Sequence, residues 1–383
     1  MDYKRDYKAY FESRLKGRYI TLEHIMPLIK SHEDFIEISI AGYSELGKEI
    51  PLIKIGNGKH VVLAWSQMHG NESTTTKALF DFLKFVGQEE FSQNEIKRFL
   101  DENSFYIIPI LNPDGADLYT RENANKIDLN RDAQKRSQSE SRALETVFNK
   151  VQPDLCLNLH DQRSIYGLET GLAATVSFLA PSANQERSLT AAREVAMSHI
   201  VRLDKMLQDL LPGQIGRYDD RFNVNCVGDT FQMAGVPTIL FEAGHCKADY
   251  HRENTRAFIF YSFLELFRFS DKQGISEDFN HYFNIPQNRM NYNDVILRRV
   301  LVKGCDKLVD IAIQYSEELV KGKVQFNAII DKIGSYDLKH GHREVDLDGS
   351  SILINSKDNI EVGQKVDKIV LKSDESAIIF LKN

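Results

Sequence analysis

The 383-residue sequence predicts an α/β protein: a mixed, mainly parallel twisted sheet with helices on both faces, plus a small β-rich appendage at the C-terminal end. Three observations support this prediction. Apolar runs of strand length alternate with helical patterns over the first 270 residues or so. The hydrophobic share of 42% is enough for a sizeable core. The residues after about 323 form short β-like pieces between turns.

The elements follow in order along the chain. A hairpin is predicted first, where DFIEISIAG and EIPLIKIG flank the turn-like YSELGK. The next segments are the strand HVVLAWSQ, the helix ESTTTKALFDFLKFV, the strand SFYIIPIL, the helix ESRALETVFNKV, the strand DLCLNLH, the helix ERSLTAAREVAMSHIVRLDKMLQDLL and the strand VPTILFEAG. Pro212 and Gly213 close the longest helix. Strands that alternate with helices indicate a sheet buried on both faces.

We predict three parts: a large α/β domain at residues 1–270, a linker and helical region at 271–322, and a small β-rich domain at 323–383. The composition becomes polar after about residue 270, and a helical run is predicted from residue 293 to about residue 320. The tail contains the β-like pieces SSILIN, KIVLK and AIIFLK, separated by Asp, Gly and Asn turns. Nothing in the tail points to chemistry.

Composition and charge exclude several classes of partner. A net charge of -7 gives no basic excess to attract nucleic acid. The N-terminus alternates charges with aromatics, without a signal-peptide core, and no later stretch reaches membrane-spanning length. We therefore expect a cytoplasmic protein without a membrane partner. The scattered cysteines form no CxxC pair and suit reduced thiols. The oligomeric state does not follow from the sequence.

Three strand ends carry residues that can bind a metal or transfer a proton. His69 and Glu72 follow one strand, with Gly70 between them to let the backbone bend; His160 and Glu242 end two others. Taken singly, HxxE could be a helix cap with a surface carboxylate, His160 a core histidine and Glu242 an ion-pair partner. Together they make the His, Glu and His set of a catalytic zinc site, with one carboxylate left as a base.

The stretch between these residues, IPILNPDGADLYTRENANKIDLNRD, completes a series of motifs. A strand followed by HxxE, then NPDG, then Arg-x-Asn running into DLNR, a strand-end His and a strand-end Glu resembles the zinc metallocarboxypeptidase family of the carboxypeptidase A type. All five elements occur in order from His69 to Gly244, and the resemblance covers most of the first 260 residues but none of the tail. HGNE and the spacing of 88 residues from Glu72 to His160 resemble the bacterial and cytosolic branches. Asp161 and Gln162 follow His160 in place of the small hydroxyl residue of the digestive branch.

The resemblance implies a role for each matching residue. His69, Glu72 and His160 would bind one Zn²⁺ per chain, and Glu242 would be the general base and acid. Asp128 would accept a hydrogen bond from the far nitrogen of His69 and fix its tautomer.

Further residues would contact the substrate. Asn130 and Arg131 would hold its terminal carboxylate, because a guanidinium matches a carboxylate bidentately. Arg121 would stabilise the oxyanion. Tyr218, 24 residues before Glu242, is the candidate for the mobile active-site tyrosine. Outside this motif, Arg121 and Arg131 would be ordinary surface ion-pair partners of their acidic neighbours. NPDG is interpreted as a turn without chemistry.

The implied function is that of a metallocarboxypeptidase, which hydrolyses the C-terminal amide bond of a peptide with a zinc-activated water and a glutamate base. One alternative is a related zinc amidohydrolase that acts on cell-wall peptides, glutamyl side chains or N-acyl amino acids. Another is a catalytically silent binding module. Asp219, Asp220 and Asp229 lie where this family often builds its specificity pocket, so a basic terminal residue is conceivable; the alternative is that they are solvated loop charges.

Overall fold

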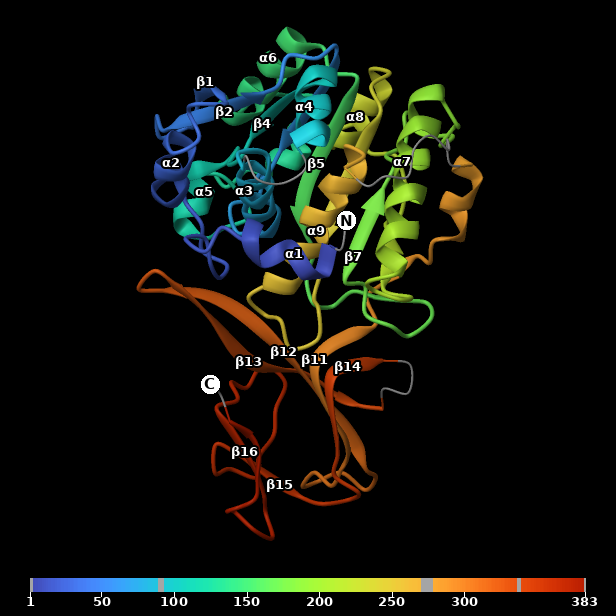
Figure 1. Cartoon of the computed structure of the whole chain (residues 1–383). Helices are drawn as coiled ribbons and strands as arrows, with labels where there is room; N and C mark the ends of the chain where they lie inside the picture. Colours follow the sequence, from blue (N-terminus) through green and yellow to red (C-terminus); the bar gives the residue numbers. More distant parts are fainter. Residues whose placement is uncertain (1–2, 89–92, 270–277, 336–338, 382–383) are drawn as a thin grey trace. The chain divides into compact units, whose positions relative to one another are not determined.

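The computed structural model describes residues 3–88, 93–269, 278–335 and 339–381. The chain divides into two compact units, each described here by itself. The first contains Met1–Gln162 and Ala174–Asn288, and the second contains Arg163–Ala173 and Arg289–Asn383. Figure 1 shows the chain coloured along the sequence, with helices gathered around the sheet of the first unit and strands making up the second. In the described part of the chain, no helix has the length and apolar character needed to cross a membrane.

The first unit is built on an eight-stranded sheet with the order β1-β2-β4-β3-β5-β9-β7-β8. Its strands are β1 (Glu37–Tyr43), β2 (Glu49–Ile55), β3 (His60–Trp65), β4 (Asn103–Ile108), β5 (Leu155–Asp161), β7 (Val176–Leu179), β8 (Ile215–Arg217) and β9 (Thr238–Ala243). Strands β4, β3, β5 and β9 run parallel, whereas β1 and β2 form the predicted antiparallel hairpin. Strand β7 is antiparallel to β9. The predicted mixed sheet is thus confirmed.

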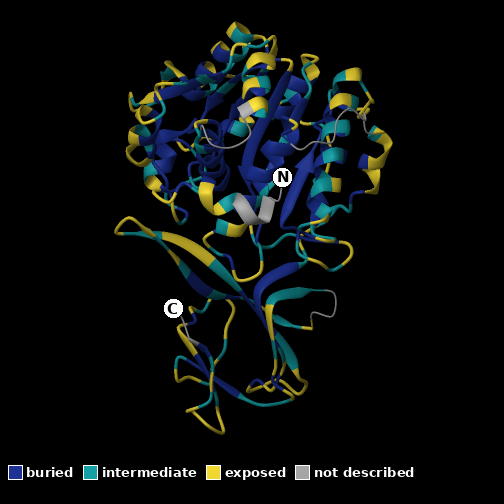
Figure 2. Cartoon of the chain, in the orientation of Figure 1, coloured by how far each residue is buried: buried dark blue, intermediate teal, exposed yellow. Residues whose placement is uncertain are grey.

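Helices cover both faces of this sheet, and β3 shows why. Val62 and Ala64 pack into one core with α3, α7 and α9, while Leu63 and Trp65 pack into a second core with α6 and α8. Successive side chains of a strand point to opposite faces, so a continuously apolar strand serves both cores. Figure 2 shows the central strands of the sheet buried, among them β3 and β5. The helices are α1 (Tyr3–Tyr10), α2 (Leu22–Lys30), α3 (Thr74–Val86), α4 (Gln93–Glu102), α5 (Pro113–Leu118), α6 (Ser139–Val151), α7 (Ala191–Gln208), α8 (Val227–Met233) and α9 (Glu253–Leu266).

In the described residues of the second unit, a four-stranded sheet and a three-stranded sheet share a separate hydrophobic core. Strands β11 (Tyr292–Val300), β12 (Val309–Val320), β13 (Lys323–Gly334) and β14 (His340–Asp346) form a sheet with the order β13-β12-β11-β14. The predicted pieces of the tail form β15 (Ile352–Ile354), β16 (Lys368–Leu371) and β17 (Ile378–Leu381). Strand β6 (Gly167–Leu168), which lies within the segment Arg163–Ala173, pairs with β10 (Asn288–Arg289).

The predicted helical run from residue 293 to about residue 320 is wrong. The structure has β11 and β12 there, paired antiparallel with Val295 opposite Ile313. The chain turns between them at Gly304, whose φ is +82°. An apolar run that is buried on both faces has no clear period, and its β-branched residues favour strands. Because Val320 pairs with Lys323 in the β12–β13 hairpin, no domain boundary separates these two residues.

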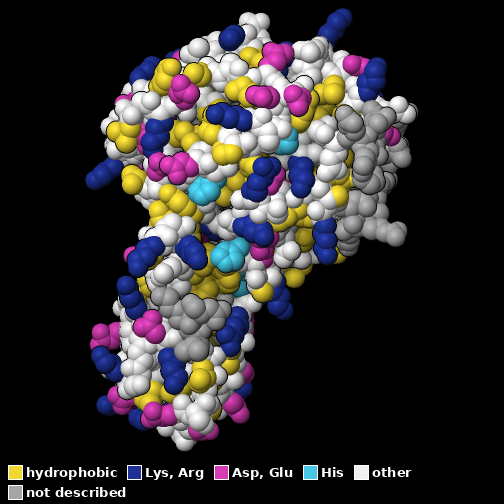
Figure 3. Space-filling model, turned by 60° about the vertical axis from the view of Figure 1, so that its left-hand side comes forward, with side chains coloured by type: hydrophobic (Ala, Val, Ile, Leu, Met, Phe, Trp, Pro, Cys, Tyr) yellow, Lys and Arg dark blue, Asp and Glu magenta, His cyan; other side chains and the backbone are white. Residues whose placement is uncertain are grey.

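Acidic and basic side chains are interspersed over the face shown in Figure 3, in keeping with the small net charge of the chain.

Candidate metal centre and substrate site

The loop between β3 and α3, residues 66–73, carries two of the predicted metal ligands. Beyond the end of β3, Ser66 and Gln67 still bond to the chain that leaves β4, through Leu111 and Asn112. Gln67 then takes a left-handed φ of +45°, which turns the chain out of the sheet. The loop packs tightly, because a Cβ added to Gly70 would lie 2.0 Å from the carbonyl carbon of Gly115. Gly70 is therefore required for close packing, and its φ is not in the left-handed region.

The NPDG motif, residues 112–115, also contacts this loop. Asn112 caps α5: its Oδ1 accepts a hydrogen bond from the amide of Gly115 at 2.9 Å. Its Nδ2 donates to the carbonyl of Met68, the residue before His69, at 3.2 Å. The motif forms the N-cap and first turn of α5, not the isolated turn predicted from the sequence, and it also positions the ligand loop. The sequence carried no signal of that second role, since the contact joins a side chain to a distant main-chain atom.

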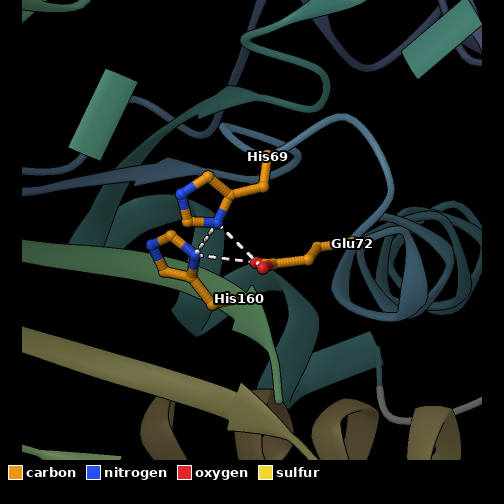
Figure 4. Close-up of side chains that lie close together, drawn as sticks. All are labelled: His69, Glu72 and His160. Atoms are coloured by element: carbon orange, nitrogen blue, oxygen red, sulfur yellow. Dashed lines mark hydrogen bonds and ion pairs between the residues drawn. The ribbon is translucent and has the colours of Figure 1, made fainter. Parts of the chain in front are cut away.

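His69, Glu72 and His160 converge on one point, as Figure 4 shows. The Nδ1 atoms of His69 and His160 each lie 2.8 Å from one carboxylate oxygen of Glu72, and 3.2 Å from each other. All three side chains are buried. Two imidazole nitrogens and a carboxylate oxygen, all within 4.8 Å of one another, are donors that zinc prefers. The donor set therefore fits a zinc ion with three protein ligands.

Asp128 supports the first ligand. Its Oδ1 lies 3.0 Å from Nε2 of His69, the nitrogen that faces away from Glu72. Its Oδ2 accepts from the guanidinium of Arg121 at 3.0 and 3.1 Å. Burial opposes ionisation of Asp128, but the hydrogen bond from His69 and the charge of Arg121 hold the pKa of this carboxyl below its ordinary value. An ionised Asp128 fixes the proton of His69 on Nε2 and leaves Nδ1 for a metal.

Glu242 lies beside the donor set without belonging to it. It pairs in register with His160 across the parallel strands β5 and β9, so the two side chains share a face of the sheet. Its Oε2 is buried and has no hydrogen-bond partner among the described residues. Burial, and then the negative charges of Glu72 and Asp161, raise the pKa of Glu242 well above its ordinary value. Such a carboxyl can hold a proton near neutral pH.

Three residues predicted to contact the substrate lie near Asp128 in the sequence: Arg121, Asn130 and Arg131. Arg121 Nη1 lies 3.1 Å from Nδ1 of His69, close to the donor set. Oδ1 of Asn130 accepts from the amide of Val227 at 3.1 Å, which leaves its NH₂ as the group that can bind a ligand. The guanidinium of Arg131 is exposed and donates to the carbonyl of Asn130 and to Sγ of Cys226.

The remaining predicted residues have different surroundings. Tyr218 follows β8 at the outer edge of the sheet, where its amide donates to the carbonyl of Phe178; its role as the mobile tyrosine stays a prediction. Asp220 is bound by Arg193 at 2.6 Å, and Asp219 is exposed. Asp229, in contrast, is buried in the first turn of α8, and burial raises its pKa to about 6.

A His, Glu and His donor set at the C-terminal edge of such a sheet is typical of zinc-dependent hydrolases. The sequence model of the family described as zinc carboxypeptidase matches residues 22–224, more than half of the chain, so the chain belongs to this family and is a zinc metallopeptidase. The match includes all three metal-ligand candidates and ends before Glu242. No curated protein matches the chain.

Several solved structures have a similar fold. The metallo-carboxypeptidase from Burkholderia cenocepacia has a TM-score of 0.53 and 16% identity, over 68% of this chain and 71% of that one. The metallo-carboxypeptidase from Pseudomonas aeruginosa, in complex with (2-guanidinoethylmercapto)succinic acid, has a TM-score of 0.50 and 17% identity, over 67% and 71%. Carboxypeptidase A from Helicoverpa armigera has a TM-score of 0.50 and 16% identity, over 65% and 73%. At these identities the likeness supports the fold alone.

Proposed function

We propose that the protein removes residues from the free C-terminal end of peptides, with one zinc per chain and Glu242 as general base. The observation that carries this proposal is the position of Glu242, in register with His160 and with a buried, unpartnered Oε2, but outside the donor set. A carboxylate so placed can take a proton near the metal without binding the metal. A hydrolase needs such a base beside its metal, whereas a protein that only binds a metal does not.

His69, Glu72 and His160 would hold the zinc, which when bound supplies Lewis-acid activation of the scissile carbonyl and of the attacking water. Glu242 takes a proton from that water and delivers it to the leaving amine. Burial, and then the negative charges of Glu72 and Asp161, raise the pKa of Glu242, which favours the step in which this carboxylate accepts a proton. Arg121 Nη1, beside Nδ1 of His69, stabilises the negative charge that develops on the carbonyl oxygen.

Asn130 and Arg131 supply the specificity for a free carboxylate. Among the described residues, the exposed guanidinium of Arg131 donates to a carbonyl and a thiol, and a carboxylate can replace both with a stronger, charge-assisted pair. The NH₂ of Asn130 adds a donor from the neighbouring residue. A C-terminally amidated peptide lacks the charge that this pair recognises, so it should be a poor substrate.

Glu242→Gln tests the proposal, because it preserves the shape of the side chain and removes the proton acceptor. We expect kcat on a free-acid peptide to fall by about 10²- to 10⁴-fold, with zinc content unchanged by elemental analysis. Glu72→Gln is the contrasting variant: it weakens a ligand, so zinc content should fall with activity, and added zinc should restore part of the rate. Near-normal turnover in Glu242→Gln, or loss of its zinc, would show that Glu242 is not the base.

A further inference from the structure

The chain before α2 is buried against the ligand loop, although it precedes the residues that match the family. The family match begins at residue 22. Within residues 12–21, Arg18 is 6% exposed and Ile20 is 2% exposed. Burying an arginine is costly unless its charge and donors are compensated. The contacts of this stretch, named here the N-terminal strap, indicate what it holds.

Two main-chain carbonyls of the strap bind the two ends of the ligand loop. Ser73, the residue after Glu72, donates its hydroxyl to the carbonyl of Arg18 at 2.6 Å. Gln67 donates its Nε2 to the carbonyl of Ile20 at 3.0 Å and to the carbonyl of Gly70 at 2.9 Å. Both side chains are fully buried. The strap therefore fixes the loop on either side of His69 and Glu72.

The side chain of Arg18 reaches the strand of the third ligand. Its Nη2 lies 3.7 Å from Oδ2 of Asp161, and both side chains are almost completely buried. The same Oδ2 accepts hydrogen bonds from the amide and the hydroxyl of Thr74, the first residue of α3. The amide of Asp161 donates to Glu72 at 3.2 Å. Asp161 thus joins β5, the ligand loop and α3, and Arg18 balances its charge.

The strap is anchored independently of the metal centre. Arg256 of α9 donates to the carbonyls of Leu15 and Glu12 at 2.6 and 3.0 Å. It is itself held by a buried ion pair with Asp81 of α3. The amide of Gly17 donates to Glu253 at 2.8 Å. Because these contacts do not involve the ligand loop, the strap can hold that loop in place before a metal binds.

We propose that the N-terminal strap is part of the metal centre. Arg18, Gln67 and Ser73 are positioning residues, which hold His69 and Glu72 in the metal-binding geometry before a metal binds. Preorganised ligands raise metal affinity, because less conformational freedom is lost on binding. This inference rests on the proposed metal site, but not on the identity of the base or of the substrate.

The test compares Ser73→Ala with a matched control, Ser104→Ala. Ser104 also donates a buried hydroxyl to a distant carbonyl, that of Gly58 at 2.8 Å, but it lies at the start of β4, the opposite end of the sheet from the ligands. Zinc dissociation constants would be measured by competition with a chromophoric chelator, together with thermal unfolding of the metal-free proteins. We expect Ser73→Ala to bind zinc about tenfold more weakly, the lower range for loss of an outer-shell partner. Ser104→Ala should bind zinc as the wild type does.

A second pair of variants separates charge from packing. Arg18→Met should weaken zinc binding at least as much as Ser73→Ala, and Arg18→Lys, which keeps a positive charge near Asp161, should recover part of the affinity. Folded Ser73→Ala and Arg18→Met proteins with the wild-type zinc dissociation constant would overturn the proposal, and so would an equal loss in Ser104→Ala. A wild-type protein that binds no zinc would refute the metal site itself.

Discussion

Replacing Asp229 by asparagine should stabilise the protein at alkaline pH but not at acid pH. Asp229 is only 8% exposed, in the first turn of α8. Burial raises its pKa from 3.8 to about 6, and the amide of Asn223, at 3.4 Å, offsets burial only in part. Asparagine keeps the shape and an acceptor oxygen for that amide, but it has no charge to bury.

The direction in which pH changes the free energy of unfolding follows from proton linkage. The folded-state pKa of Asp229 is above the unfolded-state value, so the folded chain holds the extra proton between these two pH values. The stability associated with neutral Asp229 is present below about pH 4 and is lost as the pH rises through about 6. The shift corresponds to at most about 3 kcal/mol, at 1.36 kcal/mol per tenfold change in proton affinity. Because relaxation and solvent reduce such penalties, we expect about 1 to 3 kcal/mol at pH 8.

The assay is urea unfolding of the metal-free wild type and Asp229→Asn proteins, followed by circular dichroism from about pH 4.5 to 8. The difference in free energy of unfolding should be smallest at the acid end, where protonation of the unfolded-state carboxyl begins, and should favour the variant most at the alkaline end. Asp219→Asn, which removes the same charge from an exposed side chain, controls for the change in net charge. A difference that is constant over this range, or a wild type that is more stable at pH 8, would refute the reasoning.

Three further variants test other parts of the structure. Arg131→Ala should cost about 2 to 5 kcal/mol in kcat/KM for free-acid peptides and much less for amidated ones, in parallel assays; equal losses would favour an amidohydrolase that does not recognise the terminal carboxylate. Gly70→Ala should lower both zinc content and the midpoint of thermal unfolding, since the new Cβ would meet the main chain of Gly115; an unchanged zinc content would show that the loop can relax. Arg256→Met should destabilise the protein by about 3 to 5 kcal/mol in urea unfolding, because it leaves the buried Asp81 without its cationic partner; a loss under about 1 kcal/mol would contradict that account.

The sequence predicted strands β1 to β5 and β9, helices α3, α6 and α7, and the composition of the donor set. That was possible because the parallel strands β3, β5 and β9 each end in polar residues, and parallel strands deliver their ends to one edge of a sheet. Strands β7 and β8 and helices α1, α2, α4, α5, α8 and α9 received no prediction. Helix α9, the longest of these helices, is buried nearly all round and carries no amphipathic stripe. The roles of Asn112 and Asp161 were missed for another reason. Both act through contacts with main-chain atoms more than 40 residues away, which no local pattern encodes.

The route of the chain through the second unit affects the order in which the protein can fold during synthesis. The segment Arg163–Ala173 leaves the first unit three residues after His160, and its partners come more than 100 residues later. The amide of Tyr292 donates to Ile165, the hydroxyl of Tyr292 donates to Gly171, and β6 pairs with β10. Contacts of such long sequence separation form late, because a large loop must close first. During synthesis, a nascent chain therefore contains all three candidate zinc ligands long before it contains the partners that order the segment Arg163–Ala173, which follows His160.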